Sequence, residues 1–568
     1  MARKFLTVEE ALDYMNALSD DEIDEPEVII IPPEPDLVSD EEEIDDSFTN
    51  CHTPALNDKS DLQDAAGTVE IFTKNKCDAS IFEMKDVKWK KCEPKFDLSS
   101  KSIPFQEHQN ITDIVSGKNP IELFHMMAED MIAHTVGETN RYASQKNDHS
   151  FSISEGEFKL FLGVMFYSGY HILPREKMYW ENAPDIGTTL VSNAISRKKY
   201  SDIKHYLHFN DNSTIDKQDR YYKIRPLFEK LNVALQQFGV FSENLTIDER
   251  MVRYFGKHGC KMFMKNKPVK FGYKLWMLAS YDGYPFNIIP YQGAHEKCNE
   301  PLSQRVVENL LSVVKNPAFH KVYMDNFFTS HGLLVRLKQR EFCATGTVRV
   351  NRMAKCPLKS VKDLSKTERG TSDAAFDAAN KIAAVRWNDN RVVSLMSNFE
   401  DTKVKNKVDR RIKGGRKEVD VPYCVTTYNK YKNGVDLFDS HAEVYFASIQ
   451  GKKWYWPLFL NCFETALVAA WKVFKLFCPS EAQDILTFRR SVTISYLGES
   501  IPRNKIRQRS LLQNNKELLH LNNEHILVKN ADGRQRRCQL KNCKRKPTTI
   551  CQKCNVGLCL VCFPKFHL

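Results

Sequence analysis

The chain lacks any run of about 18 uncharged apolar residues, which is close to the length that a membrane-spanning helix needs. Its start, MARKFLTVEEALDYM, also lacks the apolar stretch and the small-residue cleavage site of a secretory signal. These two absences argue against a membrane-spanning or exported protein and predict a location inside the cell. Because 568 residues exceed what a single hydrophobic core usually serves, we expect several domains.

Basic residues are almost missing from the first 50 positions, which hold two of them against 17 acidic residues. Little periodic apolar sequence accompanies this charge, so residues 1–117 are expected to form an acidic, largely disordered tail. The tail either folds back over a basic surface or only keeps the protein soluble. The net charge of +10 leaves roughly +25 after residue 50. Such a basic body suits a polyanion such as DNA, although dispersed lysines also serve solubility alone.

Apolar spacing changes from helical to alternating near residue 244. Helices are expected over 118–243, then three strands and an alternation of helices and strands over 244–350. This is the order of an RNase H-like core in a multidomain α/β protein, and it resumes over 422–446. The basic, turn-rich segment 351–421 is expected to be an insertion domain. Helices over 447–515 would complete a mainly helical domain that flanks the core.

Three aspartates stand at distinct points of this pattern. Asp248 lies inside the first predicted strand, Asp325 ends a later strand after the apolar run VYM, and Asp436 begins a helix-like stretch. Two cations held about 3.5–4 Å apart for phosphodiester cleavage need several carboxylates from separate elements. Asp439 shares a helix face with Asp436, so it either approaches the metals or orients a ligand. Glu249 is expected to point to the opposite face of its strand.

The C-terminal segment 522–568 is rich in soft metal ligands. Two tetrahedral zinc sites need eight such ligands. Seven lie within about 30 residues, and the nearest eighth upstream is His525, with His520 as the alternative. A cross-brace would form one site from Cys538, Cys543, Cys559 and Cys562, and the other from Cys551, Cys554, His525 and His567. Sites closed by four ligands are structural, and the segment would need zinc to fold. The other ten cysteines are scattered and are expected to be inert thiols.

The blocks TIDER, YMDNFFTS and NGVDLFD resemble the three catalytic blocks of piggyBac transposases. KPVKFGYKLW, ATGTV and KKWYWPLF resemble the same family, in the same order, from about residue 120 to the C terminus. The resemblance implies a catalytic metal-binding triad whose members are Asp248, Asp325 and Asp436, with Asp439 as a supporting carboxylate. It also matches Trp456 to a tryptophan beside the DNA at the reaction centre; Trp454 competes for that role, and a core position for Trp456 fits the sequence equally well.

This family resemblance implies a homodimeric, nuclear DNA transposase that uses two Mg²⁺ ions, or Mn²⁺, together with two structural Zn²⁺ ions. It also implies that the helical domain of 118–243 and 447–515 serves dimerisation and DNA binding. Such an enzyme cuts double-stranded DNA at its transposon terminal repeats through hairpin ends and inserts the element at TTAA. Lys541, Lys544 and Arg545, which lie between zinc ligands, would then contact DNA.

Two other functions remain open from the sequence. One is a host-adopted DNA-binding protein without strand transfer, and the other is a chromatin-reading or ubiquitin-ligase-type zinc module. The basic clusters KNKVDRRIKGGRK and RNKIRQR fit nuclear import, DNA contact or a solvated linker.

Overall fold

The computed structural model describes residues 86–498, apart from 257, 265–266, 268, 294–300 and 413–414. It also describes 525–567, apart from 526 and 531, and the backbone of three short strands before residue 86. Two compact units result, Met1–Gly498 and Glu499–Leu568. The cluster RNKIRQR and His520 lie outside the described residues.

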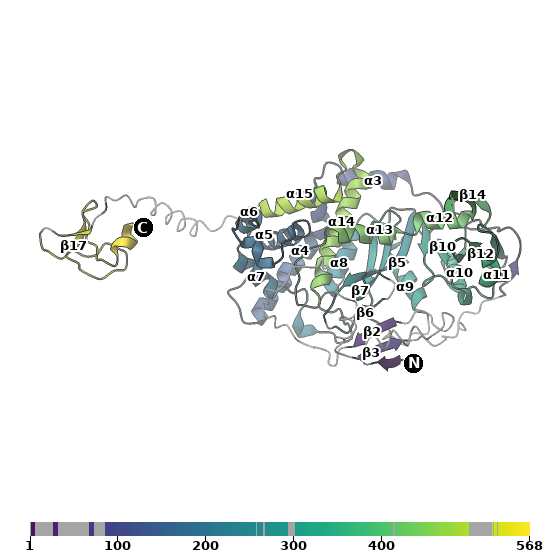
Figure 1. Ribbon diagram of the computed structural model, residues 1–568, viewed down its shortest axis with the longest axis horizontal. Coiled ribbons are helices and arrows are strands. Elements are labelled where there is room, and N and C mark those ends of the chain that lie inside the picture. Colours follow the sequence, from purple (N-terminus) through teal and green to yellow (C-terminus); the bar gives the residue numbers. More distant parts are fainter. Residues whose placement is uncertain are drawn as a thin grey trace. The chain divides into compact units, whose positions relative to one another are not determined.

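Figure 1 shows helices and strands mixed within the first unit. Its strands are β1 (Ala2–Phe5), β2 (Glu27–Ile31), β3 (Thr68–Phe72), β4 (Trp89–Lys90), β5 (Asn244–Arg253), β6 (Lys261–Phe263), β7 (Phe271–Ser280), β8 (Pro285–Pro290), β9 (Lys321–Met324), β10 (Cys343–Thr347), β11 (Ser372–Asp377), β12 (Ile382–Asn388), β13 (Val392–Ser397), β14 (Val404–Ile412) and β15 (Gly415–Pro422). Its helices are α3 (Phe105–Val115), α4 (Pro120–Gln145), α5 (Glu155–Ser168), α6 (Thr189–Ala194), α7 (Arg197–Tyr206), α8 (Arg225–Leu235), α9 (Leu302–Leu310), α10 (His331–Gln339), α11 (Val361–Ser365), α12 (Tyr423–Tyr431), α13 (Gly434–Val444), α14 (Trp456–Phe477) and α15 (Ile485–Gly498). The second unit contains β16 (Leu527–Lys529), β17 (Thr549–Cys551) and α17 (Phe563–His567).

Strand β5 is the centre of the main sheet. It pairs antiparallel with β7 and parallel with β9, while β8 pairs antiparallel with β7 and β10 pairs parallel with β9. The order across this part is therefore β8-β7-β5-β9-β10. Parallel neighbours need a crossover, which α9 and α10 supply. The fold is mixed α/β, as the sequence predicts.

The segment 351–421, which the sequence predicts to be an insertion domain, lies between β10 and α12 in the chain and adds strands to the main sheet. Strand β13 pairs antiparallel with β10, and β12, β11 and β4 continue the same sheet. All seven residues of β12 are buried, so this strand needs neighbours on both edges and cover on both faces. Only β14 and β15 stand apart, as a separate two-stranded sheet.

The predicted end of the disordered tail, residue 117, lies too far along the chain. Helix α3 places Ile111 and Val115 four residues apart on one face, and both are buried in the main core. Strand β4 pairs Trp89 with Asp377 of β11. Farther upstream, β2 pairs with both β3 and β6. Ordered structure thus begins well before residue 118.

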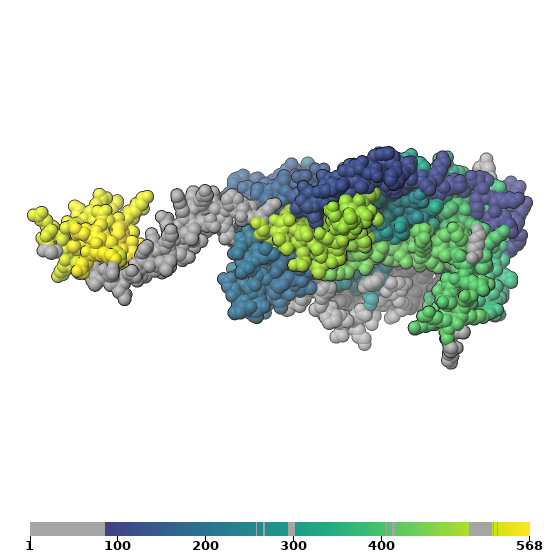
Figure 2. Space-filling view, turned by 90° about the horizontal axis from the view of Figure 1, so that it is seen from above, coloured from purple at the N-terminus to yellow at the C-terminus, as the bar shows by residue number. Residues whose placement is uncertain are grey.

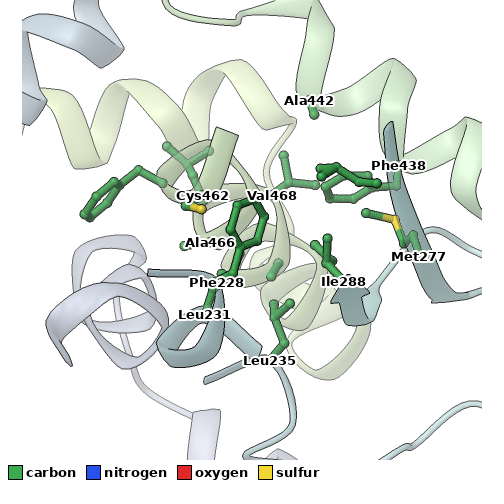
Figure 3. Packing of buried hydrophobic residues seen from close by; sticks show 14 of the residues in the cluster. Phe228, Leu231, Leu235, Met277, Ile288, Phe438, Ala442, Cys462, Ala466 and Val468 are labelled. Carbon is green, nitrogen blue, oxygen red and sulfur yellow. The ribbon is translucent and has the colours of Figure 1, made fainter. Parts of the chain in front are cut away.

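Helix α14 organises the helical core. It packs against α4 and α8, and α15 packs against α5, so helices from both predicted halves of the helical domain share one core. Figure 3 shows Phe228 and Leu231 of α8 facing Cys462 and Ala466 of α14, with Ile288 of β8 close by. With 22 residues, α14 is long and apolar enough to cross a membrane by length and composition, but 94% of its apolar window is buried inside the protein.

Candidate metal centres

An acidic pocket lies at the ends of two parallel strands. The register pairs Ile247 of β5 with Met324 of β9, so the next residues are Asp248 and Asp325. The carboxyl ends of parallel neighbours meet at one edge of a sheet, where α/β proteins commonly bind ligands. Oxygen atoms of these two carboxylates and of Glu249 all lie within 4.8 Å of one another.

Helix α13 brings Asp436 to the same pocket. Its first residue, Gly434, lies so close to the sheet that a Cβ there would be 2.1 Å from the Ser280 carbonyl oxygen and 2.6 Å from Thr246 Oγ1. Only glycine permits this approach of helix and strand backbones. Asp436 follows in the first helical turn and lines the pocket together with the two strand aspartates. A helix N-terminus favours a negative side chain at this position.

The turn after β9 fixes the orientation of Asp325. The Phe327 amide donates a 2.9 Å hydrogen bond to Asp325 Oδ1, and Thr329 Oγ1 donates a 2.8 Å hydrogen bond to the Asp325 carbonyl. A Cβ on Gly346, the glycine of ATGTV, would lie 2.1 Å from Thr329 Oγ1. The glycine therefore makes room for the side chain that holds this turn.

Glu249 lies closer to the aspartates than strand alternation predicts. The Lys267 Nζ atom is 3.1 Å from the Glu249 carboxylate and 3.8 Å from that of Asp248, so one ammonium group bridges both. Alternation fixes only the direction of Cβ, and the longer glutamate side chain reaches the shared cation. The expectation that Glu249 points away from the site is corrected on this geometry.

Burial and charge set the protonation of this cluster. Burial, reinforced by the neighbouring Glu249, raises the pKa of Asp248 well above its usual value. Burial also acts to raise the pKa of Glu249, but the ammonium groups of Lys274 and Lys267 outweigh it and the pKa falls. The buried Lys274 ammonium lies 4.0 Å from the ring centroid of Trp276. Lys274 and Lys267 thus together lower the pKa of Glu249, whereas for Asp248 burial and the charge of Glu249 outweigh Lys267.

Asp439 is held by a buried arginine. Arg250, whose side chain is 1% exposed, forms an ion pair with Asp439 and donates a 2.6 Å hydrogen bond to Asn461 of α14. It comes two residues after Asp248 on β5, whereas Asp439 comes three after Asp436 on α13. This pair therefore ties the strand of one pocket aspartate to the helix of another.

The pocket has other lining residues that the sequence did not predict. Tyr323, Tyr428, Lys432 and Asn433 also line the pocket, which has a volume of about 90 Å³. The Lys432 ammonium lies 5.5 Å from the ring centroid of Tyr428. The sequence block NGVDLFD begins at Asn433, so the start of this block could have indicated the neighbouring pocket residues. No comparable sequence signal marked Arg250.

The structure places Trp456 in the core rather than at a surface. Its ring is 3% exposed, packs edge-on against Phe161, and donates its indole N–H to the Ile449 carbonyl at 3.0 Å. A ring buried in this way cannot stack on a base, which corrects the expected DNA contact. Trp454 is half-buried and stacks on His258 with 4.1 Å between ring centroids.

In the C-terminal unit the structure gathers the expected zinc ligands into two groups of four. The first group contains Cys538, Cys543, Cys559 and Cys562, and the second contains His525, Cys551, Cys554 and His567. Within each group the ligand atoms lie within 4.8 Å of one another, and His525 Nδ1 is 3.4 Å from both sulfur atoms of its group. Alternating pairs along the chain thus join the same group, as in the expected cross-brace.

The surface of this unit is strongly basic. Residues 525–567 contain ten lysines and arginines and one acidic residue, Asp532. Lys541, Lys544 and Arg545 are all exposed. Such a surface suits a phosphate backbone.

Comparisons with known proteins identify the family of the chain. The family model described as Transposase IS4 matches residues 119–471, which places the chain among transposases. The human PiggyBac transposable element-derived protein 3 is 35% identical over 459 residues, covering 79% of this chain and 76% of the relative. The human PiggyBac transposable element-derived protein 2 is 34% identical over 398 residues, covering 68% and 67%.

A solved structure shares the fold. It is a cryo-EM structure of a piggyBac transposase synaptic complex with hairpin DNA, matched with a TM-score of 0.58 and 21% identity over 79% of this chain and 98% of that chain. The chain belongs to the piggyBac transposase family.

Proposed function

We propose that the protein is a cut-and-paste DNA transposase whose strand chemistry takes place in the acidic pocket. The observation that carries this proposal is the convergence of Asp248, Asp325 and Asp436 from two strands and a helix. We further propose that β8-β7-β5-β9-β10 forms an RNase H-like core, supported by its three antiparallel strands followed by two parallel ones.

The donor set of the pocket fits divalent metal ions. Mg²⁺ prefers hard carboxylate oxygens, and burial beside Glu249 makes the ionised form of Asp248 costly, a cost that a bound cation would lower. Asp248, Asp325 and Asp436 would hold two Mg²⁺ ions, or Mn²⁺. Metals bound there would activate the attacking oxygen and stabilise the leaving oxygen. Arg250 and Asp439 keep the helix and strand in register, and Lys432 on the pocket wall offers a cation to a DNA phosphate.

The two groups of sulfur and nitrogen ligands fit Zn²⁺ in closed, structural sites. We propose that they fold the C-terminal unit, whose exposed Lys541, Lys544 and Arg545 contact the transposon terminal repeats. Cutting through hairpin ends, insertion at TTAA, action as a homodimer and nuclear location complete the proposal, which family membership supports.

Purified protein tests this function directly. With Mg²⁺ and DNA carrying the inverted repeats that flank its own gene, the protein should cleave at the repeat ends. Asp325→Asn, which keeps the side-chain shape but loses the charge, should abolish cleavage. The matched control Asp185→Asn removes an exposed carboxylate outside the pocket and should cleave normally. Equal cleavage by Asp325→Asn would contradict the assignment.

A host-adopted DNA-binding protein without strand transfer is the second candidate. The similarity to two human proteins named as transposable element-derived favours it. A cell-based excision assay separates the two, because binding to the repeats without excision would support only the second candidate.

A further inference from the structure

The ribbon of β14 and β15 is anchored at one end and open to solvent at the other. Val408, Val419 and Val421 pack into a small core with helix α12. Toward the tip, residues 415–418 are all exposed. In Figure 2 the green part of the chain that includes this ribbon extends at the lower right. The described residues on either side of the turn, 410–411 and 415–418, are called the tip of the ribbon, and the fold leaves Arg411 and 415–418 uncovered.

The tip brings like charges face to face. The register pairs Arg410 with Lys417 and Arg411 with Arg416. Like charges directly opposite one another on neighbouring strands are destabilising. Asp389 lies 3.1 Å from Arg410 and Glu368 lies 2.5 Å from Lys417, so acidic neighbours offset the first pair.

The pair next to the second one on the same face of the ribbon is acidic, Asp409 opposite Glu418, and Glu418 lies 3.4 Å from Lys407. Within the described part of the chain, neither Arg411 nor Arg416 forms an ion pair. The protein thus maintains an unfavourable pair at an exposed position, which is expected where a binding partner supplies the missing negative charge.

We propose that the tip of this ribbon binds duplex DNA, with Arg411 and Arg416 contacting backbone phosphates. The planar guanidinium group matches phosphate oxygens with two parallel hydrogen bonds. A two-stranded ribbon fits the major groove, which is about 12 Å wide. Phosphates on the two sides of the groove would relieve the repulsion between the two arginines.

The ribbon is continuous with the acidic pocket. Strand β15 ends at Pro422 and helix α12 begins at Tyr423, and Tyr428 of that helix lines the pocket. At about 3.3 Å per residue, Arg411 stands roughly 23 Å from Val404 at the ribbon base. That length corresponds to about seven base pairs of DNA at 3.4 Å each. The identity of this DNA, a duplex that also reaches the pocket, rests on the proposed function.

Salt-dependent binding of the full-length protein tests the proposal. A fluorescently labelled 40-base-pair duplex would be titrated by anisotropy at several NaCl concentrations, with the protein unaltered and as Arg411→Ala/Arg416→Ala. Because each phosphate contact contributes about −0.9 to the slope of log affinity against log salt, losing two should reduce the slope by about 1.8. At 0.15 M salt this corresponds to roughly 30-fold weaker binding.

Two further readouts exclude a merely structural effect. Lys101→Ala/Lys315→Ala removes the same charge from exposed positions outside the ribbon and should leave the slope nearly unchanged. The melting temperature of Arg411→Ala/Arg416→Ala should stay the same or rise, since a repulsive pair is removed.

The outcomes separate a failure of the ribbon proposal from a failure of the proposed function. An unchanged slope in the ribbon variant would overturn the proposal, and a simultaneous loss of nuclear import would assign the ribbon to a protein partner instead. If the unaltered protein bound no duplex, the proposed function and the ribbon's DNA contact would both fail.

Discussion

Loss of the Arg250 guanidinium should destabilise the larger unit without removing any pocket carboxylate. Arg250→Met keeps most of the side-chain length and leaves Asp439 and Asn461 without their donor. Breaking a buried ion pair by removing one partner costs about 3–5 kcal/mol. Because the Asp439 side chain keeps 32% of its surface exposed, we expect the lower end, about 3 kcal/mol. At about 2.1 cal/mol/K per residue over roughly 400 ordered residues, the melting temperature should fall by about 3–4 °C.

A double-mutant cycle isolates the pair from its surroundings. Asp439→Leu alone leaves the buried arginine unpaired and should also destabilise the protein, whereas Arg250→Met/Asp439→Leu removes both charges. Replacing both members of a buried pair by apolar groups is often close to neutral, so the double variant should be more stable than the two single losses summed. Urea unfolding followed by tryptophan fluorescence measures all four proteins. Strict additivity, or a loss below about 0.5 kcal/mol in Arg250→Met, would refute the link between strand and helix.

Burial raises the pKa of Glu400 to about 7, so the folded protein retains a proton that the unfolded chain releases above its ordinary pKa of 4.5. The free energy of unfolding should therefore fall by about 3 kcal/mol as the pH rises from 4.5 to 7. Urea titrations at pH 5 and 8 should show that Glu400→Gln removes this fall. An unchanged pH dependence in the variant would contradict the raised pKa of Glu400. Lys267→Met removes the cation beside Asp248 and Glu249, so calorimetry should show Mn²⁺ binding roughly tenfold tighter or more. Weaker binding would show that the lysine supports the metal rather than competing with it. Removal of zinc by a strong chelator should unfold the C-terminal unit, while the larger unit keeps its melting transition. The unfolding should appear as a loss of dispersed NMR signals from residues such as Leu558. Persistence of those signals would contradict a structural role for zinc.

The pocket aspartates and the zinc ligands were accessible from sequence because both leave local marks. Asp248 interrupts a strand, Asp325 ends one, and cysteines recur at short ligand spacings. The strands β5, β7 and β8 were likewise visible as alternating runs.

Long-range relations were not visible in the same way. Nothing near Arg250 in the chain announces that its partner is Asp439, 189 positions later, because that contact depends on how α13 crosses the sheet. The joining of β13 to β10 was missed for the same reason, since strand pairing is a tertiary property. Trp456 looked like a possible DNA contact because sequence alone does not distinguish an aromatic ring at a surface from one beneath it.

The charge pattern of KNKVDRRIKGGRK acquired meaning only from its register. The sequence shows a basic cluster with several possible uses, whereas the pairing of Arg411 with Arg416 reveals a repulsion that composition cannot express. The strand register thus indicates where on the protein a negatively charged partner should bind, which the net charge alone does not.

Whether the three aspartates hold the catalytic metal is tested most directly by a crystal structure. Crystals of the unaltered protein would be grown with Mn²⁺ and its terminal-repeat DNA, and anomalous scattering would locate the metal. Anomalous peaks should lie among the carboxylates of Asp248, Asp325 and Asp436, with a DNA phosphate beside them. Metal peaks elsewhere and none in this pocket, with DNA bound, would contradict this prediction.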